Sequence, residues 1–87
     1  MKDVSGGAWL VYLLLCGDGT YYCGATNGLE RRIMLHNKGA ASRYTRGRGP
    51  VTLVTASRPL AKGEALSLEA RVKKARREAK PGLILNY

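Results

Sequence analysis

The stretch AWLVYLLLCGDGTYYCGAT, residues 8–26, predicts a β-hairpin, and the other elements of the fold are predicted from the residues that follow it. Residues 8–16 are apolar at both alternating sets of positions, which is typical of a strand covered on both faces and therefore central in its sheet. Residues 17–19, Gly-Asp-Gly, are a strong turn sequence. Residues 20–25 are rich in aromatic and β-branched side chains, which favour a partner strand.

The residues after the hairpin predict a helix over about 27–38. Asn27 can cap its first turn, and Glu30 three residues later completes a capping-box-like pair. Gly39 can adopt the left-handed conformation that ends many helices. The Gly- and Arg-rich residues 40–50 then predict a loop.

The second half of the chain predicts one more strand and one long helix. Alternation over residues 51–56 favours a third strand. Apolar residues recur at helical spacing over about 62–79, and Pro81-Gly82 would end that helix. An apolar tail at 83–85 is expected to pack back on the body. The order β-β-α-β-α predicts a small α/β (α+β) fold, a three-stranded antiparallel sheet flanked by helices, as a single domain over residues 1–87.

The charge of the chain is strongly positive. Its 87 residues carry a net charge of +9, and the isoelectric point is about 10.1. No acidic residue occurs between Glu30 and Glu64. This pattern fits a polyanionic partner, meaning nucleic acid or an acidic membrane surface, although a solvated, solubilising surface is the alternative. Six basic residues are the predicted nucleic-acid contacts: Arg43, Arg46, Arg48, Lys73, Lys74 and Arg77.

Three features favour a cytoplasmic protein that does not enter a membrane. The longest apolar run, residues 8–16, is far too short to cross a bilayer. Residues 1–7 lack the apolar stretch and cleavage site of a secretory signal. Cys16 and Cys23 are not in a metal-type C-x-x-C spacing, and we expect both to be reduced, buried strand residues.

Two tyrosines of the hairpin are candidate site residues. With the turn centred near Asp18, Tyr12 lies about opposite Gly24 and diagonal to Tyr22, so both phenols project from one face. Gly24 leaves space where a larger side chain would fill that face. Packing of the two rings is the simpler alternative to chemistry.

Arg32 and His36 add basic groups from the first predicted helix. Their i, i+4 spacing places them on one face of the helix. Together they could bind a phosphate, with Arg32 as the bidentate partner. The alternative for His36 is a core histidine whose hydrogen bonds are satisfied inside the protein.

Glu69 borders the apolar stripe of the last predicted helix. A carboxylate at such a position costs free energy unless it meets a cation. One hypothesis is a structural ion pair with Arg32 or Arg76. The other is a divalent metal such as Mg2+, which is held by one or two carboxylates together with waters and substrate phosphate.

These positions together resemble the GIY-YIG nuclease family. Trp9-Leu-Val-Tyr12-Leu-Leu is similar to the GIY half of its motif, without the Gly, and residues 21–26 (Tyr-Tyr-Cys-Gly-Ala-Thr) are similar to the YIG half. The ordered series continues with R-x-x-x-H-N at 32–37 and A-L-x-x-E at 65–69, and the segments Tyr44-Thr45-Arg46 and Pro50–Val54 lie between these two. The resemblance covers about residues 9–80. It is nearest to the short stand-alone prokaryotic proteins and to the catalytic domain of the eukaryotic subunit that cuts branched DNA.

The resemblance implies a divalent-metal-dependent endonuclease that hydrolyses DNA phosphodiester bonds, for instance at branches, flaps or nicks in DNA repair or recombination. Tyr22 would be the general base, and Tyr12 would position the attacking water or the phosphate. Arg32 would stabilise the phosphate, and His36 would hydrogen-bond to Tyr22 or the phosphate. Glu69 would be the one protein ligand of a single Mg2+ or Mn2+. The resemblance to the short stand-alone proteins implies a domain without a DNA-targeting appendage, and a partner protein would then supply targeting.

Two other hypotheses remain open at this point. One is a non-catalytic basic nucleic-acid-binding module on the same scaffold. The other is a small basic ribosome- or RNA-associated protein, for which charge alone would suffice. A pure binder would not need the complete polar set, and this favours the enzyme: Tyr12, Tyr22, Arg32, His36 and Glu69.

Overall fold

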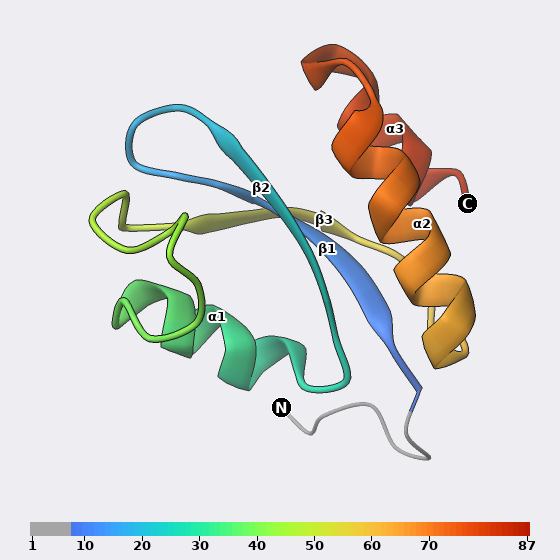
Figure 1. Cartoon of the computed structure of the whole chain (residues 1–87), viewed down its shortest axis with the longest axis horizontal. Helices are drawn as coiled ribbons and strands as arrows, with labels where there is room; N and C mark the ends of the chain where they lie inside the picture. The colour runs from blue at the N-terminus through green and yellow to red at the C-terminus, as the bar shows by residue number, and fades with distance from the viewer. Residues whose placement is uncertain (1–7) are drawn as a thin grey trace.

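The computed structural model describes residues 8–87 and shows a three-stranded antiparallel sheet with helices on both of its faces (Figure 1). Strand β1 (Leu10–Leu15) is central, and β2 (Tyr21–Thr26) and β3 (Thr52–Ala56) lie on either side of it. The predicted fold class, the hairpin and the central position of its first strand are therefore confirmed. The expectation that residues 1–7 are no secretory signal lies outside the described residues.

The register of the hairpin is the one that the turn sequence predicts. Tyr12 pairs with Gly24, and Leu14 pairs with Tyr22. Asp18 fixes the turn because its side chain accepts hydrogen bonds from both the amide and the hydroxyl of Thr20. Gly19 has a φ of 84°, which a glycine adopts without strain.

The helices cover both faces of the sheet because β1 is apolar on both sides. Helix α1 (Leu29–Asn37) packs on one face, and α2 (Lys62–Lys74) and α3 (Lys80–Leu85) lie on the other (Figure 1). The core on the α2 and α3 side contains Val11, Leu13, Cys23, Leu60, Ala65, Leu68, Val72 and Ile84. The core on the α1 side contains Leu10, Tyr12, Leu14, Cys16, Leu29 and Val51. Both cysteines are free and buried, as predicted.

The predicted capping of α1 by Asn27 is wrong. Gly28 precedes the helix, and no side chain caps its first turn. The chain turns directly from β2 into α1, and the buried Thr26 hydroxyl accepts the Gly28 amide at 3.0 Å. The other end follows the prediction, because Gly39 has a φ of 76° directly after the helix and its capping residue, Lys38. Residues 40–50 form a loop without a helix, also as predicted.

The single helix predicted over 62–79 is also wrong. Helix α2 ends at Lys74, and a short 3-10 helix η2 (Arg77–Ala79) leads into α3. The Lys80 ammonium donates to the carbonyls of Val72 and Lys73 at 2.7 and 3.2 Å and so closes the end of α2. Pro81 lies in the first turn of α3, where its missing N–H costs nothing, so it begins a helix instead of ending one.

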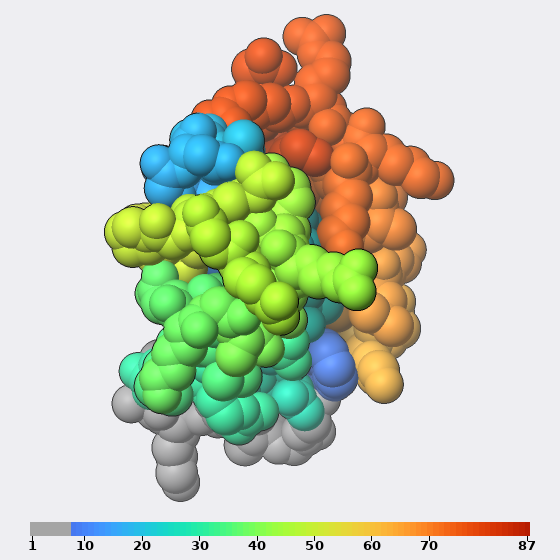
Figure 2. Space-filling view, turned by 60° about the vertical axis from the view of Figure 1, so that its left-hand side comes forward, coloured from blue at the N-terminus to red at the C-terminus, as the bar shows by residue number. Residues whose placement is uncertain are grey.

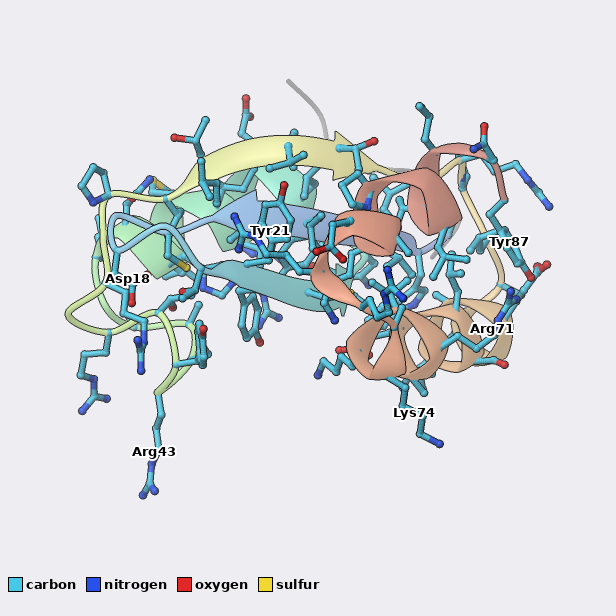
Figure 3. The ribbon with its side chains drawn as sticks, turned by 90° about the horizontal axis from the view of Figure 1, so that it is seen from above. Asp18, Tyr21, Arg43, Arg71, Lys74 and Tyr87 are labelled. Atoms are coloured by element: carbon cyan, nitrogen blue, oxygen red, sulfur yellow. The ribbon has the colours of Figure 1, made fainter. Side chains whose placement is uncertain are left out.

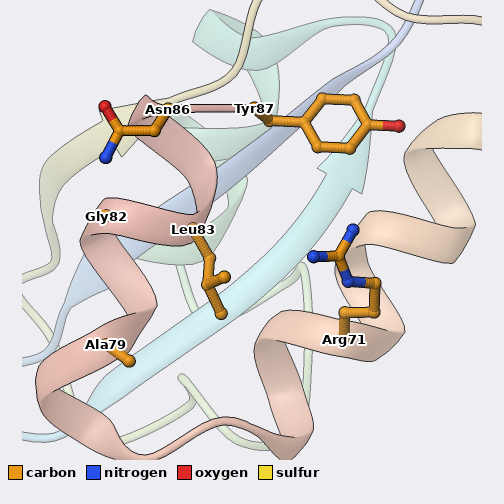
Figure 4. Close-up of a pocket in the computed structure, with 6 residues that line it drawn as sticks. All are labelled: Arg71, Ala79, Gly82, Leu83, Asn86 and Tyr87. Carbon is orange, nitrogen blue, oxygen red and sulfur yellow. The ribbon is translucent and has the colours of Figure 1, made fainter.

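The apolar tail packs on the body as expected, because Ile84 is buried. A hollow of about 410 Å³ opens between α2 and α3 (Figure 4). It is lined by Arg71, Ala79, Gly82, Leu83, Asn86 and Tyr87. None of the five predicted site residues borders this hollow. Across residues 8–87, the structure contains no helix with the length and apolar character needed to span a membrane.

Candidate active site at the edge of strand β2

A buried chain of hydrogen bonds joins strand β1, helix α1 and the loop 40–50. The Tyr12 hydroxyl lies 2.8 Å from Nε2 of His36, and Nδ1 of His36 lies 2.7 Å from the Thr45 hydroxyl. The exposed fractions of Tyr12, His36 and Thr45 are 2%, 1% and 1%. Both nitrogens of His36 are therefore engaged, and its hydrogen bond goes to Tyr12 and not to Tyr22 or to an open phosphate position.

Gly24 makes room for the Tyr12 ring. A Cβ atom on Gly24 would lie 2.6 Å from Cζ of Tyr12 and closer still to its hydroxyl oxygen. The Tyr12 ring therefore lies across the backbone of its partner strand, which allows the hydroxyl to reach His36 on α1. The space predicted at Gly24 is filled by Tyr12 itself.

Tyr22 lies at the entrance to this buried chain. Its ring centroid is 6.4 Å from that of Tyr12, 5.0 Å from that of His36 and 5.8 Å from that of Tyr44. The Lys73 ammonium of α2 lies 6.0 Å from the Tyr22 ring. Since β2 is an edge strand, groups from both faces of the sheet can meet at Tyr22, and its side chain is only half-buried.

The pKa values of Tyr12 and His36 in this hydrogen-bonded chain differ from those of free side chains. Burial raises the pKa of the Tyr12 hydroxyl well above its usual range, and the charge of Tyr22 raises it further, whereas Arg32 lowers it and Glu69 raises it. Burial, and then the charge of Arg32, lower the pKa of His36. At neutral pH Tyr12 is therefore protonated and His36 is neutral. The same effects show that Tyr22, Arg32 and Glu69 all lie within electrostatic range of Tyr12.

Arg32 and Glu69 complete the cluster from opposite faces of the sheet. The half-buried Arg32 guanidinium forms no ion pair or side-chain hydrogen bond with another residue in 8–87. Glu69 is only 19% exposed in its side chain and accepts the Lys73 ammonium at 3.0 Å. The predicted structural partners, Arg32 and Arg76, are therefore wrong. Arg76 lies beyond the end of α2, whereas Lys73 follows Glu69 by one helical turn.

The donor set around Glu69 fits a weakly held Mg2+. Residues 8–87 contain no group of three or more His, Cys, Asp or Glu side chains suited to a metal. Mg2+ does not require such a group, because it keeps several waters and binds through one or two carboxylates and substrate phosphate. Lys73 engages one oxygen of Glu69, and the other oxygen has no hydrogen-bond or ion-pair partner within residues 8–87.

The basic residues near the site differ in how firmly they are held. Arg48 is tied to Asp18 at 2.6 Å, and its guanidinium stacks 4.3 Å from the Tyr44 ring centroid. Arg43 and Lys74 instead project away from the body, in the same direction, on the side of the molecule where β2 lies (Figure 3). The remaining three predicted contacts are partly engaged by neighbours: Arg46 with the Gly39 carbonyl, Lys73 with Glu69, and Arg77 with the Tyr21 ring.

The loop 40–50 forms one wall of the site. Figure 2 shows this loop in yellow-green lying over the green helix α1, with the orange helix α2 on the other side. Its Tyr44 ring lies beside that of Tyr22, tilted by 31°, and its Thr45 hydroxyl contacts His36. The backbone amide of Val51, just after the loop, donates to Asn37 Oδ1 at 2.8 Å. Thr45, Tyr44 and Asn37 were not among the predicted site residues, although all three lie in the segments that carry the family resemblance.

Comparison with known proteins identifies the family of the chain. Residues 8–81 match the family of the GIY-YIG catalytic domain. The chain belongs to the GIY-YIG family. GIY-YIG domains form a nuclease superfamily whose members generally use divalent metals and act on DNA. The sequence-based resemblance to the GIY-YIG family is therefore confirmed.

Several GIY-YIG relatives match much of the chain. A UPF0213 protein of Nitratidesulfovibrio vulgaris is 50% identical over 66 residues, which are 76% of this chain and 60% of that protein. A UPF0213 protein of Halobacterium salinarum is 45% identical over 73 residues, which are 84% of this chain and 95% of that protein. The solution structure of a protein from E. faecalis is similar with a TM-score of 0.62 at 34% identity, covering 94% of this chain and 85% of that one. A UPF0213 protein of Bacillus halodurans gives a TM-score of 0.54 at 41% identity, covering 88% and 82%.

Proposed function

We propose that this protein is an endonuclease that hydrolyses DNA phosphodiester bonds with the help of one divalent metal ion. One observation carries the proposal, namely that side chains from β1, β2, α1 and α2 converge at the edge of β2. A packed core does not require two phenols, a guanidinium, an imidazole and a carboxylate to meet at one place. These residues are Tyr12, Tyr22, Arg32, His36 and Glu69.

Of the two phenols, Tyr22 is the one suited to accept a proton from water. The Tyr12 hydroxyl is buried, protonated and bonded to His36. Tyr22 is half-buried at an open edge of the sheet, where a water molecule and a phosphate can reach it. We therefore assign Tyr22 as the general base, and Tyr12 as the group that positions the attacking water or the phosphate.

Arg32 and Glu69 are assigned to the phosphate. Within residues 8–87 the Arg32 guanidinium has no hydrogen-bond or ion-pair partner, and a planar guanidinium matches a phosphate bidentately. Glu69 would hold Mg2+ or Mn2+, and the bound ion would supply positive charge for the phosphate and the leaving oxygen. Lys73 beside Glu69 keeps the carboxylate in place while no ion is bound.

The basic side chains around the site are assigned to the DNA backbone. Arg43 and Lys74 project past the edge of β2, on the side where the scissile phosphate would lie. Contacts of this kind go to phosphates and do not select a sequence. The substrate would therefore be chosen by its shape, for example a branch, a flap or a nick in repair or recombination, with a partner protein supplying targeting.

The test is incubation of the protein with linear, nicked, flapped and branched DNA, with and without Mg2+ or Mn2+. We expect cleavage of at least one of these DNAs, dependent on the metal and abolished by a chelator. Retarded migration of every DNA without cleavage under any metal condition would instead support a non-catalytic binding module on the same scaffold.

A further inference from the structure

The Thr45 hydroxyl occupies an unusual place for a loop side chain. It is 1% exposed and touches Nδ1 of His36 at 2.7 Å. Behind it lies Ser42, whose hydroxyl is 3.0 Å from that of Thr45 and also accepts the Thr45 amide at 3.2 Å. A buried hydroxyl with partners on both sides fixes the direction in which its neighbours donate and accept hydrogen bonds.

The donor and acceptor in each of these hydrogen bonds follow from the proton of the Tyr12 hydroxyl. The Tyr12 hydroxyl carries one proton, and within residues 8–87 its only hydrogen-bond partner is His36. With no other acceptor for it among residues 8–87, that proton points at Nε2 of His36, which then acts as the acceptor. A neutral imidazole whose Nε2 accepts carries its own proton on Nδ1, and that proton points at Thr45. Because Thr45 then accepts from His36, its own proton is left for Ser42, whose hydroxyl and carbonyl oxygens lie 3.0 and 3.5 Å away.

We propose that Thr45 is a positioning residue that holds His36 in the tautomer protonated on Nδ1, so that His36 keeps accepting the proton of Tyr12. The consequence for cleavage rests on the function proposed above, whereas the tautomer does not. With its proton directed at His36, the Tyr12 oxygen presents only lone pairs to the site. It can then accept a hydrogen bond from the attacking water and cannot donate one.

Without the Thr45 hydroxyl, Nδ1 of His36 loses its hydrogen-bond acceptor. A buried Nδ1–H without an acceptor costs free energy, so the proton of His36 would move to Nε2 or the ring would turn. A proton on Nε2 would oppose the proton of Tyr12, and the Tyr12 hydroxyl would rotate away from His36. Valine has nearly the same shape as threonine, so Thr45→Val removes the hydroxyl without leaving a large cavity.

The first measurement is the nitrogen NMR spectrum of the His36 ring at neutral pH, which needs no assignment because the chain contains 1 histidine. We expect wild type to show a protonated Nδ1 and an unprotonated Nε2. We expect Thr45→Val to lose this pattern and Thr45→Ser, which keeps the hydroxyl, to retain it. Thr52→Val is the matched control, because Thr52 is exposed on β3 and should leave the pattern unchanged. A wild-type spectrum with the proton on Nε2 would overturn the proposal, even if Thr45→Val failed to fold.

The second measurement is the single-turnover cleavage rate of the same variants on a DNA that wild type cleaves. We expect Thr45→Val to lower the rate on the order of 10-fold, the equivalent of one hydrogen bond, with unchanged DNA affinity. Thr45→Ser should restore most of the rate. If Thr45→Val changes the tautomer but cleaves like wild type, Thr45 is not a positioning residue, and the proposed nuclease function still stands. If wild type cleaves no DNA, the nuclease function fails, and the NMR spectrum still decides the tautomer.

Discussion

The Tyr12 ring lies across the Cα atom of Gly24, its partner in the β1–β2 pair. A Cβ at position 24 would come within 2.6 Å of the Tyr12 ring. This close approach directs the Tyr12 hydroxyl along the sheet toward His36 on α1. The hydrogen-bonded chain that organises the site therefore depends on the absence of one methyl group in the neighbouring strand.

Gly24→Ala is expected to disturb both stability and cleavage. The added methyl group would force the Tyr12 ring away and break its hydrogen bond to His36. We expect a loss of about 1–3 kcal/mol in the free energy of unfolding, measured by urea denaturation, together with a loss of cleavage. Gly63→Ala is the matched control, because nothing lies within 4 Å of its added methyl group and alanine favours a helix. Wild-type stability and cleavage for Gly24→Ala would show that the close approach has no importance.

Glu69→Gln should distinguish a metal-binding role of Glu69 from a structural role. The ion pair with Lys73 is an i, i+4 pair with a half-exposed ammonium, and such pairs contribute about 0.3–0.5 kcal/mol. We therefore expect a melting temperature close to that of wild type and a cleavage rate that collapses at every Mg2+ or Mn2+ concentration. Glu64→Gln on the same helix is the control, because Glu64 pairs with Tyr87 and Arg58 and is not one of the predicted site residues. Full cleavage by Glu69→Gln would reject its role as metal ligand.

Arg43→Gln and Lys74→Gln should weaken DNA binding with little effect on the fold. Neither side chain forms an ion pair within the part of the chain that the structure describes. If each contacts one phosphate, each substitution should reduce the slope of the logarithm of affinity against the logarithm of salt concentration by about 1. Arg58→Gln, which removes a charge near Tyr87, is the control. If both variants keep the wild-type salt dependence of affinity, the DNA does not contact Arg43 or Lys74.

Asp18 should make stability depend on pH at the acidic end. Hydrogen bonds from Thr20 and Arg48 lower the pKa of Asp18 from 3.8 to about 2. Because the folded pKa is the lower one, this stabilisation is complete above the unfolded pKa and is lost as the pH falls through the folded value. Asp18→Asn should therefore be less stable than wild type at neutral pH, and the difference should vanish near pH 2. Glu78→Gln, whose carboxylate is exposed, is expected to show no such convergence.

Much of the fold was predictable because its signals are local. The apolar run of β1 and the Gly-Asp-Gly turn predict the hairpin and its register, and the register alone places Tyr12 and Tyr22 on one face. The i, i+4 spacing of Arg32 and His36 predicts their common helix face. These residues were found because strand and helix periods carry over directly into three dimensions.

The remaining features depend on contacts between distant parts of the chain. The apolar pattern continues at helical spacing past Lys74, but α2 ends there, and Lys80 donates to its last carbonyls. Thr45 becomes part of the site only through the path of an irregular loop, which has no period to interpret. The Glu69–Lys73 pair is the exception, since its i, i+4 spacing is visible in the sequence.

The most direct test of the central claim is the single-turnover cleavage rate of Tyr22→Phe beside that of Tyr21→Phe. The two tyrosines are neighbours on β2, but Tyr22 faces the site and Tyr21 packs on the other face against Arg77. Both substitutions keep the ring and remove only a hydroxyl. We predict that Tyr22→Phe cleaves about 100-fold or more slowly than wild type, with unchanged melting temperature and DNA affinity, while Tyr21→Phe cleaves normally. Equal, wild-type cleavage by both variants would show that Tyr22 only packs, and would contradict a hydrolytic site at the edge of β2.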